Sequence, residues 1–210
     1  MGRLFDLDSP IMQKLTRASH VFFCGAFFLI CCLPVITAGA SATAMYKMMF
    51  NLREDKGTRA SDFFKVFARE LKTSTVLWLL DLLFLAITGL FFYLILLTGT
   101  EGVVLYLMMF VFFLLLFGWA FTFSYVFAYT AYFQNTIGAT VKNGFLMAIS
   151  NRRSTIPVLF LSVIPVLGYM VSPYYFLVLL PLWVFVALPA IFYFRSGILL
   201  KVFSKYVPGD

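Results

Sequence analysis

Long apolar runs separated by short charged stretches make up most of this chain. A helix needs roughly 20 apolar residues to cross the hydrocarbon core of a bilayer. Four runs carry no formal charge apart from one aspartate, Asp81: Ala18–Tyr46, Thr73–Thr100, Gly102–Val141 and Ser154–Phe194. The last run is long enough for two crossings with a turn at Ser172-Pro173. The pattern predicts an all-α fold, a polytopic membrane helical bundle with five or six transmembrane segments.

A break in the first apolar run decides between five and six segments. Pro34 lacks a backbone donor, and Thr37 and Gly39 follow it closely. One arrangement is a single kinked helix that runs to Met49 and leaves the N-terminus outside. In the other, the chain turns at Pro34–Gly39 and returns through residues 40–51. We favour the hairpin because it leaves all 16 Lys and Arg residues on one side, and keep the kinked helix as the alternative.

The charged stretches predict segments at the inner membrane surface. Residues 1–17 read as an interfacial N-terminal segment, with a helix start at Ser9-Pro10. Within the cytoplasmic loop 52–72, residues 61–72 have helical period, and the spacing of Phe63, Phe67 and Leu71 predicts one apolar stripe. Such a helix suits the inner interface, lying flat before the next crossing. Residues 195–210 are expected to form a cytoplasmic tail, and the whole chain, 1–210, to be a single membrane domain.

The remaining crossings follow from the apolar runs and from the residues that interrupt them. We expect one crossing from Thr75 to Thr98, a long helix from Val103 to about Phe133, and two final crossings at about 156–171 and 175–194. Prolines inside the last two predict kinked helices: Pro157, Pro165, Pro181 and Pro189.

Composition and charge narrow the class of protein further. The chain is 62% hydrophobic and only 12% charged, whereas about a quarter of the residues in soluble domains are charged. The net charge of +7 comes from basic residues in alternate loops, and the turns near Glu101 and Ser172 carry none. This is the positive-inside distribution, which places the C-terminus in the cytoplasm and makes nucleic-acid binding unnecessary as an explanation.

Asp81 is the first candidate for a binding role. It is the only carboxylate inside a crossing, where an ionisable side chain is costly and usually faces the bundle or a wet cavity. Its functional interpretation is an ion-linked or polar-substrate contact. Its structural interpretation is a carboxylate held by a hydroxyl or indole donor on another helix. The break at Pro34, Thr37 and Gly39 is the second candidate, because unwound backbone at membrane depth can line a binding site.

No pattern of catalytic residues is present in the sequence. The single histidine, His20, lies near no evident nucleophile motif and suits a hydrogen bond at the interface. Cys24, Cys31 and Cys32 lack the spacing of a metal site or a disulfide framework and read as packing residues. Phosphate-loop and zinc-protease motifs are absent from the sequence. We therefore predict no enzyme activity, no cofactor and no metal.

Residues 20–80 resemble a known family. Leu33–Gly39, Ala42–Tyr46, the charged turn at Arg53–Gly57 and Asp62–Lys65 are similar to the YesL family, a group of small bacterial integral membrane proteins of unknown function. Ala38 stands where that family usually has a bulky aliphatic residue. The resemblance implies a multi-pass protein of the bacterial plasma membrane. Because members often accompany carbohydrate uptake and polysaccharide degradation, it also implies an accessory role in sugar transport.

Two functions follow from these observations. The first is a non-enzymatic accessory or regulatory component of a carbohydrate uptake system, whose partners would be membrane lipids and a transporter permease or another membrane protein. The alternative is an autonomous small transporter or channel that uses Asp81 and the Pro34–Gly39 helix break.

Overall fold

Helices account for every regular element in the part of the chain that the structure, a computed structural model, describes: residues 10–99 and 101–207. Five helical segments are long and apolar enough to cross a membrane: Leu15–Cys32, Ala60–Thr98, Val103–Tyr132, Arg152–Val171 and Leu180–Phe203. The predicted all-α membrane bundle is confirmed, with five such segments rather than six.

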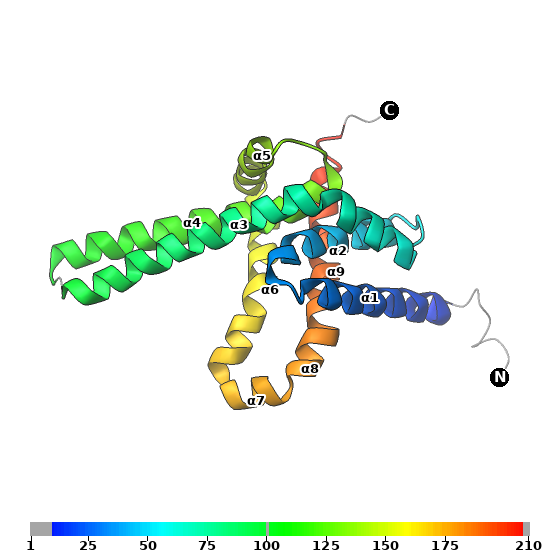
Figure 1. Cartoon of the computed structure of the whole chain (residues 1–210), viewed down its shortest axis with the longest axis horizontal. Coiled ribbons are helices and arrows are strands. Elements are labelled where there is room, and N and C mark those ends of the chain that lie inside the picture. The colour runs from blue at the N-terminus through cyan, green and yellow to red at the C-terminus, as the bar shows by residue number, and fades with distance from the viewer. Residues whose placement is uncertain (1–9, 100, 208–210) are drawn as a thin grey trace.

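The first apolar run folds as a hairpin. Helix α1 (Pro10–Cys32) is followed by a short 3-10 turn, η1 (Val35–Thr37), and helix α2 (Ala38–Arg53) returns beside α1 (Figure 1). Ser9, the proposed helix cap, and the rest of residues 1–9 lie outside the described residues. Pro10 is the first helical residue, so residues 10–17 are part of α1 rather than a separate segment.

Two contacts close the open end of this hairpin. Arg17 Nη2 lies 2.7 Å from Asp55 Oδ1 in an ion pair. Thr58 Oγ1 and His20 Nδ1 are hydrogen-bonded at 2.9 Å. The beginning of α1 therefore lies beside the chain just after α2. This geometry decides for the hairpin and against the single kinked helix.

Helix α2 is the central element of the fold rather than a sixth crossing. Its 16 residues span about 24 Å, less than the roughly 30 Å of a bilayer core. Eleven of them are buried, and α2 contacts α1, α3, α4 and α9. Small residues allow this close packing: a Cβ added at Gly39 would lie 2.4 Å from the Ser74 carbonyl oxygen and 2.7 Å from Trp78 Cβ.

Helix α3 (Ala60–Thr98) is continuous, which differs from the expected flat helix at 61–72 followed by a separate crossing. The sequence contains no Pro or Gly between Ala60 and Gly89, so nothing breaks the helix where the turn was expected. Its 39 residues span about 58 Å. The buried stripe also differs from the predicted one, because Phe63 is buried but Leu71 is 38% exposed.

Helices α3 and α4 (Val103–Tyr132) form a long hairpin (Figure 1). The turn between them uses Gly99 and Gly102, whose φ angles of 56° and 69° lie in the left-handed region that glycine adopts without strain. The bounds of α4 confirm the predicted long helix from Val103 to about Phe133.

The chain after α4 forms a second long hairpin, which points in a different direction from the α3–α4 hairpin (Figure 1). After α5 (Ile137–Ser150), its first arm is α6 (Arg152–Val171). Its other elements follow in chain order: α7 (Pro173–Val178), α8 (Leu180–Leu182), the π-helical turn η2 (Trp183–Ala187) and α9 (Leu188–Phe203).

The turn of the second hairpin lies at Ser172-Pro173, as predicted. Ser172 has extended backbone (φ −158°, ψ 99°), the conformation favoured before a proline. The short helix α7 occupies the turn, so the return crossing begins at Leu180 rather than near residue 175. The π-helical turn directly precedes α9, whose second residue, Pro189, has no backbone N–H for the regular helical hydrogen bond.

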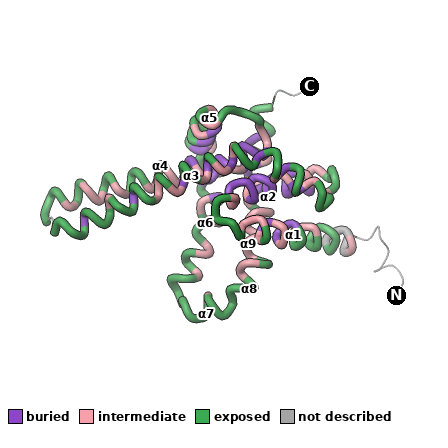
Figure 2. The backbone as a smooth tube through the Cα atoms, viewed as in Figure 1, coloured by how far each residue is buried: buried purple, intermediate pink, exposed green. Residues whose placement is uncertain are grey.

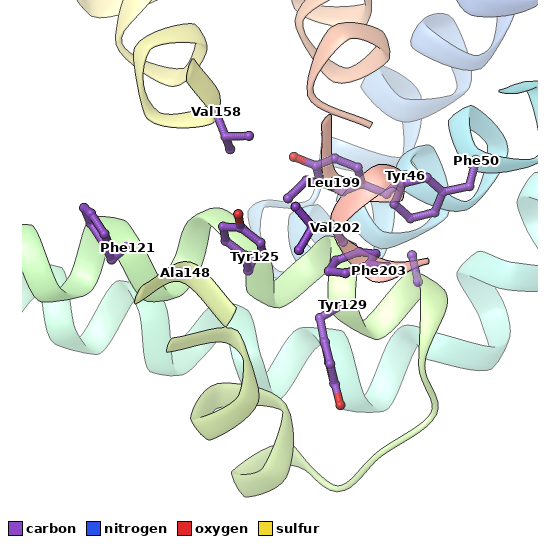
Figure 3. Close-up of a cluster of buried hydrophobic side chains, with 12 residues drawn as sticks. Tyr46, Phe50, Phe121, Tyr125, Tyr129, Ala148, Val158, Leu199, Val202 and Phe203 are labelled. Carbon is purple, nitrogen blue, oxygen red and sulfur yellow. The ribbon is translucent and has the colours of Figure 1, made fainter. Parts of the chain in front are cut away.

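The second arm extends beyond the predicted membrane edge. Helix α9 continues to Phe203, although residues 195–210 were expected to form a tail, because apolar residues recur at helical spacing after Arg195. Leu199, Val202 and Phe203 are fully buried (Figure 3). Residues 208–210 lie outside the described residues. The Phe203 ring contacts aromatic rings of α2, of α4 and of the residue that follows α4: Phe50, Tyr125, Tyr129, Tyr132 and Phe133.

A clamp joins the end of α2 to α9. Arg53 Nε donates to Tyr193 O at 3.2 Å and to Ser196 Oγ at 3.1 Å, and its guanidinium carbon lies 4.1 Å from the Tyr193 ring centre. A Cβ added at Gly197 would come within 2.5 Å of that carbon, so glycine makes room for the arginine. Burial lowers the pKa of Arg53 from its ordinary value. Arginine nevertheless stays charged at neutral pH.

Candidate functional site

Asp81 lies where the α3–α4 hairpin meets the α6–α9 hairpin. It is only 4% exposed, and its Oδ1 accepts a hydrogen bond from Trp119 Nε1 of α4 at 2.6 Å. A hydrogen bond to a charged acceptor is worth about 1.5–3 kcal/mol, so the indole compensates part of the cost of burying the carboxylate. This is the indole donor on another helix that the structural interpretation of Asp81 predicts.

The second feature is a cavity of about 360 Å³ beside Asp81. We call it the fork cavity, because it lies where the α3–α4 and α6–α9 hairpins separate. Five helices contribute to its wall: α2, α3, α4, α6 and α9. The lining residues are Ala42, Tyr46, Asp81, Trp119, Ala120, Phe123, Ser124, Phe127, Leu159, Ser162, Val163, Val166, Phe192 and Arg195.

Arg195 brings a positive charge to the same cavity. Its Nη2 donates to the Ser124 carbonyl oxygen at 3.1 Å, and its guanidinium carbon lies 5.7 Å from the Tyr46 ring centre. Arg195 Nε and the Tyr46 hydroxyl are both buried and have no hydrogen-bond partner among the described residues. Each such group costs about 1–3 kcal/mol when it stays unsatisfied. Each would therefore gain a hydrogen bond if a small side-chain movement exposed it to the cavity.

The two charges of the fork cavity are not in contact. The ion pairs found among residues 10–99 and 101–207 involve neither Asp81 nor Arg195. A carboxylate and a guanidinium thus line one cavity, with aromatic walls that include Phe123, Phe127 and Phe192. This arrangement can bind a polar group that satisfies both, and it resembles ligand sites in general: mostly apolar walls with a few converging polar groups.

The residues of the predicted helix break form a turn of their own. Thr37 Oγ1 lies 2.6 Å from Cys31 O and 2.8 Å from Pro34 O, so its one proton can be donated to either carbonyl, and Cys31 O belongs to the last turn of α1. Trp78 Nε1 donates to Val35 O at 2.8 Å. These contacts explain Pro34 and Thr37 as parts of a closed turn.

Neither the turn nor Gly39 lines the fork cavity. The nearest atoms to a Cβ at Gly39 belong to Ser74, Trp78 and Phe127, and only Phe127 also lines the cavity. The structure therefore brings Gly39 close to the cavity wall and keeps Pro34 and Thr37 apart from it. A binding role for these three residues stays a prediction without a contact to support it.

The other reactive side chains form no site of their own among the described residues. Cys24, Cys31 and Cys32 are free thiols on α1, and His20 is hydrogen-bonded to Thr58. Throughout the described ranges, no three His, Cys, Asp or Glu side chains gather closely enough to hold a metal ion.

Three residues of the fork cavity were missed by the sequence analysis: Tyr46, Trp119 and Arg195. The signal for Arg195 was present, since apolar residues recur after it at helical spacing and predict that the helix continues. For Trp119 and Tyr46 the apolar runs contain many aromatic residues at equivalent depth. Only the packing of α2 and α4 distinguishes these two from the rest.

Comparison with known proteins gives one match. Residues 21–98 match the family described as "Protein of unknown function, DUF624". This segment covers most of α1, all of α2 and all of α3, so it includes Gly39, Tyr46 and Asp81 but neither Trp119 nor Arg195. No curated protein and no solved structure matches the chain. Over residues 21–98 the chain is therefore similar to a family whose function is itself unknown.

Proposed function

We propose that this chain is a non-enzymatic accessory or regulatory component of a carbohydrate uptake system. It would lie in the bacterial plasma membrane with its C-terminus in the cytoplasm, and it would pack against a transporter permease or another membrane protein. The positive-inside distribution of charge supports this orientation.

The observation that carries the proposal is the divergence of the two hairpins (Figure 1). In each of the five potential spans, at most 17% of the most apolar 18-residue window is buried, and for α4 none of it is. A pore or carrier must surround its pathway with protein, since lipid cannot solvate a polar solute. The chain's own helices leave the outer parts of both hairpins uncovered, which suits a subunit that adds to a larger assembly.

The sugar class of the solute rests on the resemblance of residues 20–80 to the YesL family. The fork cavity is compatible with it, because a hydroxyl group can accept from Arg195 or Tyr46 and donate to Asp81. Aromatic rings in the wall suit the apolar face of a sugar ring.

An autonomous small transporter is the second candidate, and the fork cavity is the observation that favours it. A buried carboxylate such as Asp81 is a common feature of solute and proton pathways. The helix break at Pro34–Gly39 supports a transporter less than expected, because Thr37 and Trp78 donate hydrogen bonds to carbonyl groups of the turn.

Transport by the purified chain separates these two functions. We expect liposomes that contain only this protein to take up no radiolabelled sugar. Host cells that lack the protein should take up at least one sugar more slowly, and uptake should return when the protein is restored. Asp81→Asn should restore uptake too, because the amide oxygen can still accept the hydrogen bond from Trp119.

Two outcomes would contradict the accessory role. One is sugar transport by the wild-type protein alone in liposomes, lost in the Asp81→Asn variant. The other is normal uptake of every sugar tested in cells without the protein. The matched control is Asp81→Leu, which removes the acceptor of the Trp119 indole and tests stability rather than charge.

A further inference from the structure

A second concave surface lies between α1 and α9. It is an open groove of about 530 Å³. We call it the α1–α9 groove, and its lining residues are Arg17, Ala18, Val21, Phe22, Phe185, Val186, Pro189, Ala190 and Tyr193. Apart from Arg17 and the Tyr193 hydroxyl, this lining is entirely apolar. The groove therefore has a long apolar floor with polar groups from only two residues.

Helix geometry explains why the two helices leave this space. They approach each other closely at one point, where a Cβ on Gly25 would lie 2.3 Å from Pro189 Cγ. The π-helical turn Trp183–Ala187 supplies Phe185 and Val186 to the groove. Such turns within helices are frequent at functional sites. Together the close crossing and the widened turn leave a gap that no side chain of the described residues fills.

Two arginines mark the polar end of the groove. Arg17 lines it directly, and the Arg53 guanidinium lies over the ring of Tyr193, which also lines it. Arg17 is close enough to Arg53 to lower its pKa, in addition to the larger effect of burial. Among the described residues, the acidic side chain paired with Arg17 is Asp55, which is 74% exposed. Arg17 thus lines the polar end of the groove, with the positive charge of Arg53 and the exposed carboxylate of Asp55 nearby.

The position of Arg17 along α1 sets the depth of the groove in the bilayer. Arg17 directly precedes the charge-free run that begins at Ala18, so we expect it at the level of the lipid headgroups, with Val21 and Phe22 deeper. Basic pockets between transmembrane helices on the cytoplasmic side bind anionic headgroups. Apolar side chains below such a pocket match an acyl chain.

We propose that the α1–α9 groove is a binding site for an anionic phospholipid, with the phosphate at Arg17, beside the positive charge of Arg53, and an acyl chain along Val21, Phe185 and Val186. The lipid phosphate replaces Asp55 as the partner of Arg17. The site is separate from the fork cavity and does not depend on the carbohydrate role.

Lipid titration of the purified protein tests this site. The protein in detergent micelles is titrated with dioleoyl-phosphatidylglycerol or dioleoyl-phosphatidylcholine, and bound lipid is counted by native mass spectrometry. We expect tighter binding of phosphatidylglycerol by at least about tenfold. Arg17→Gln should remove most of this preference, and Asp55→Asn should increase it, because the competing carboxylate is gone. Asn also tolerates the left-handed backbone of Asp55, whose φ is 52°.

Three further variants distinguish binding of the headgroup from binding of the acyl chain, and binding at this site from a general effect of charge. Ala190→Phe fills the groove without changing charge and should weaken the binding of both lipids. Arg152→Gln removes a positive charge from the exposed start of α6 and should leave the preference unchanged. Arg17→Lys keeps the charge and should retain the preference, which checks that a loss in Arg17→Gln is electrostatic. Equal affinity for the two lipids, or an equal loss in Arg17→Gln and Arg152→Gln, would overturn the proposal.

Discussion

The packing around α2 and the packing at the ends of the two hairpins are opposite extremes in one molecule. In α2, Ala40, Ala44, Met45, Met48 and Met49 have no exposed surface (Figure 2). Near the α3–α4 turn, Leu97 is 62% exposed and Tyr106 75%. Near the α6–α7 turn, Val171 is 86% exposed.

This difference shows which part of the fold is complete in one chain. Small and flexible side chains let α2 fill the space between its neighbours, so the region around it forms a core without a partner. The hairpin ends are apolar on nearly every side, and only lipid or another protein can cover such surfaces. Stability should therefore come from the α2 region, and association from the hairpins.

The largest effect of a glycine substitution on stability should follow from an added methyl group between α2 and α3. In Gly39→Ala the new methyl would clash with the Ser74 carbonyl, which belongs to the backbone and cannot move aside, and we expect a loss of about 3 kcal/mol in the free energy of unfolding. Unfolding by SDS in mixed micelles, followed by circular dichroism, measures it. Gly89→Ala on α3 is the matched control, since no heavy atom lies within 4 Å of its Cβ position. Equal stability of the two variants would contradict the tight α2–α3 contact.

A smaller effect should follow from displacing the Arg53 clamp. Gly197→Ala places a methyl against the end of a flexible arginine side chain, which can move away but loses its bonds to Tyr193 and Ser196. Hydrogen bonds from a charged group are worth about 1.5–3 kcal/mol, so we expect a loss of about 2 kcal/mol in the same unfolding assay. Gly138→Ala, where the added Cβ meets no atom within 4 Å, should cause no loss. If Arg53→Ala is as stable as the wild type, the clamp does not hold α9.

The smallest effect on folding should come from the hairpin end. Leu97→Ala removes an exposed side chain, and we expect the free energy of unfolding to change by less than about 0.5 kcal/mol. Leu77→Ala on the same helix removes a fully buried side chain and should lose about 2–5 kcal/mol. If Leu97→Ala instead destabilises the isolated protein as much as Leu77→Ala does, the hairpin end is covered by the chain itself and the proposed division fails.

The sequence predicts the crossings well because length and charge control them. The charge-free runs, Pro34 and Ser172-Pro173 determine where helices start, turn and end, and these features act locally. The hairpin of α1 and α2 also follows from the sequence, since the distribution of basic residues favours it. The alternative of six crossings fails, because α2 is too short to cross and is buried instead.

The fork cavity depends on contacts that local patterns do not encode. Asp81 stands out because a carboxylate is rare in an apolar run, but its partner Trp119 is 38 positions further along the chain. Arg195 was assigned to the tail because a positive charge usually marks a membrane edge. Its burial against Tyr46 follows from the way α9 packs on α2 and α4, which periodicity alone does not reveal.

The unbroken length of α3 has a mechanical consequence. A helix of 39 residues is a rod of about 58 Å, held at one end by α2 and contacted towards the other by α4, where the rings of Phe92 and Phe112 stack. If the held end tilts by about 5°, the far end moves by about 5 Å, the rise of one helical turn. Asp81 lies between the two ends, so a tilt of α3 also moves one wall of the fork cavity.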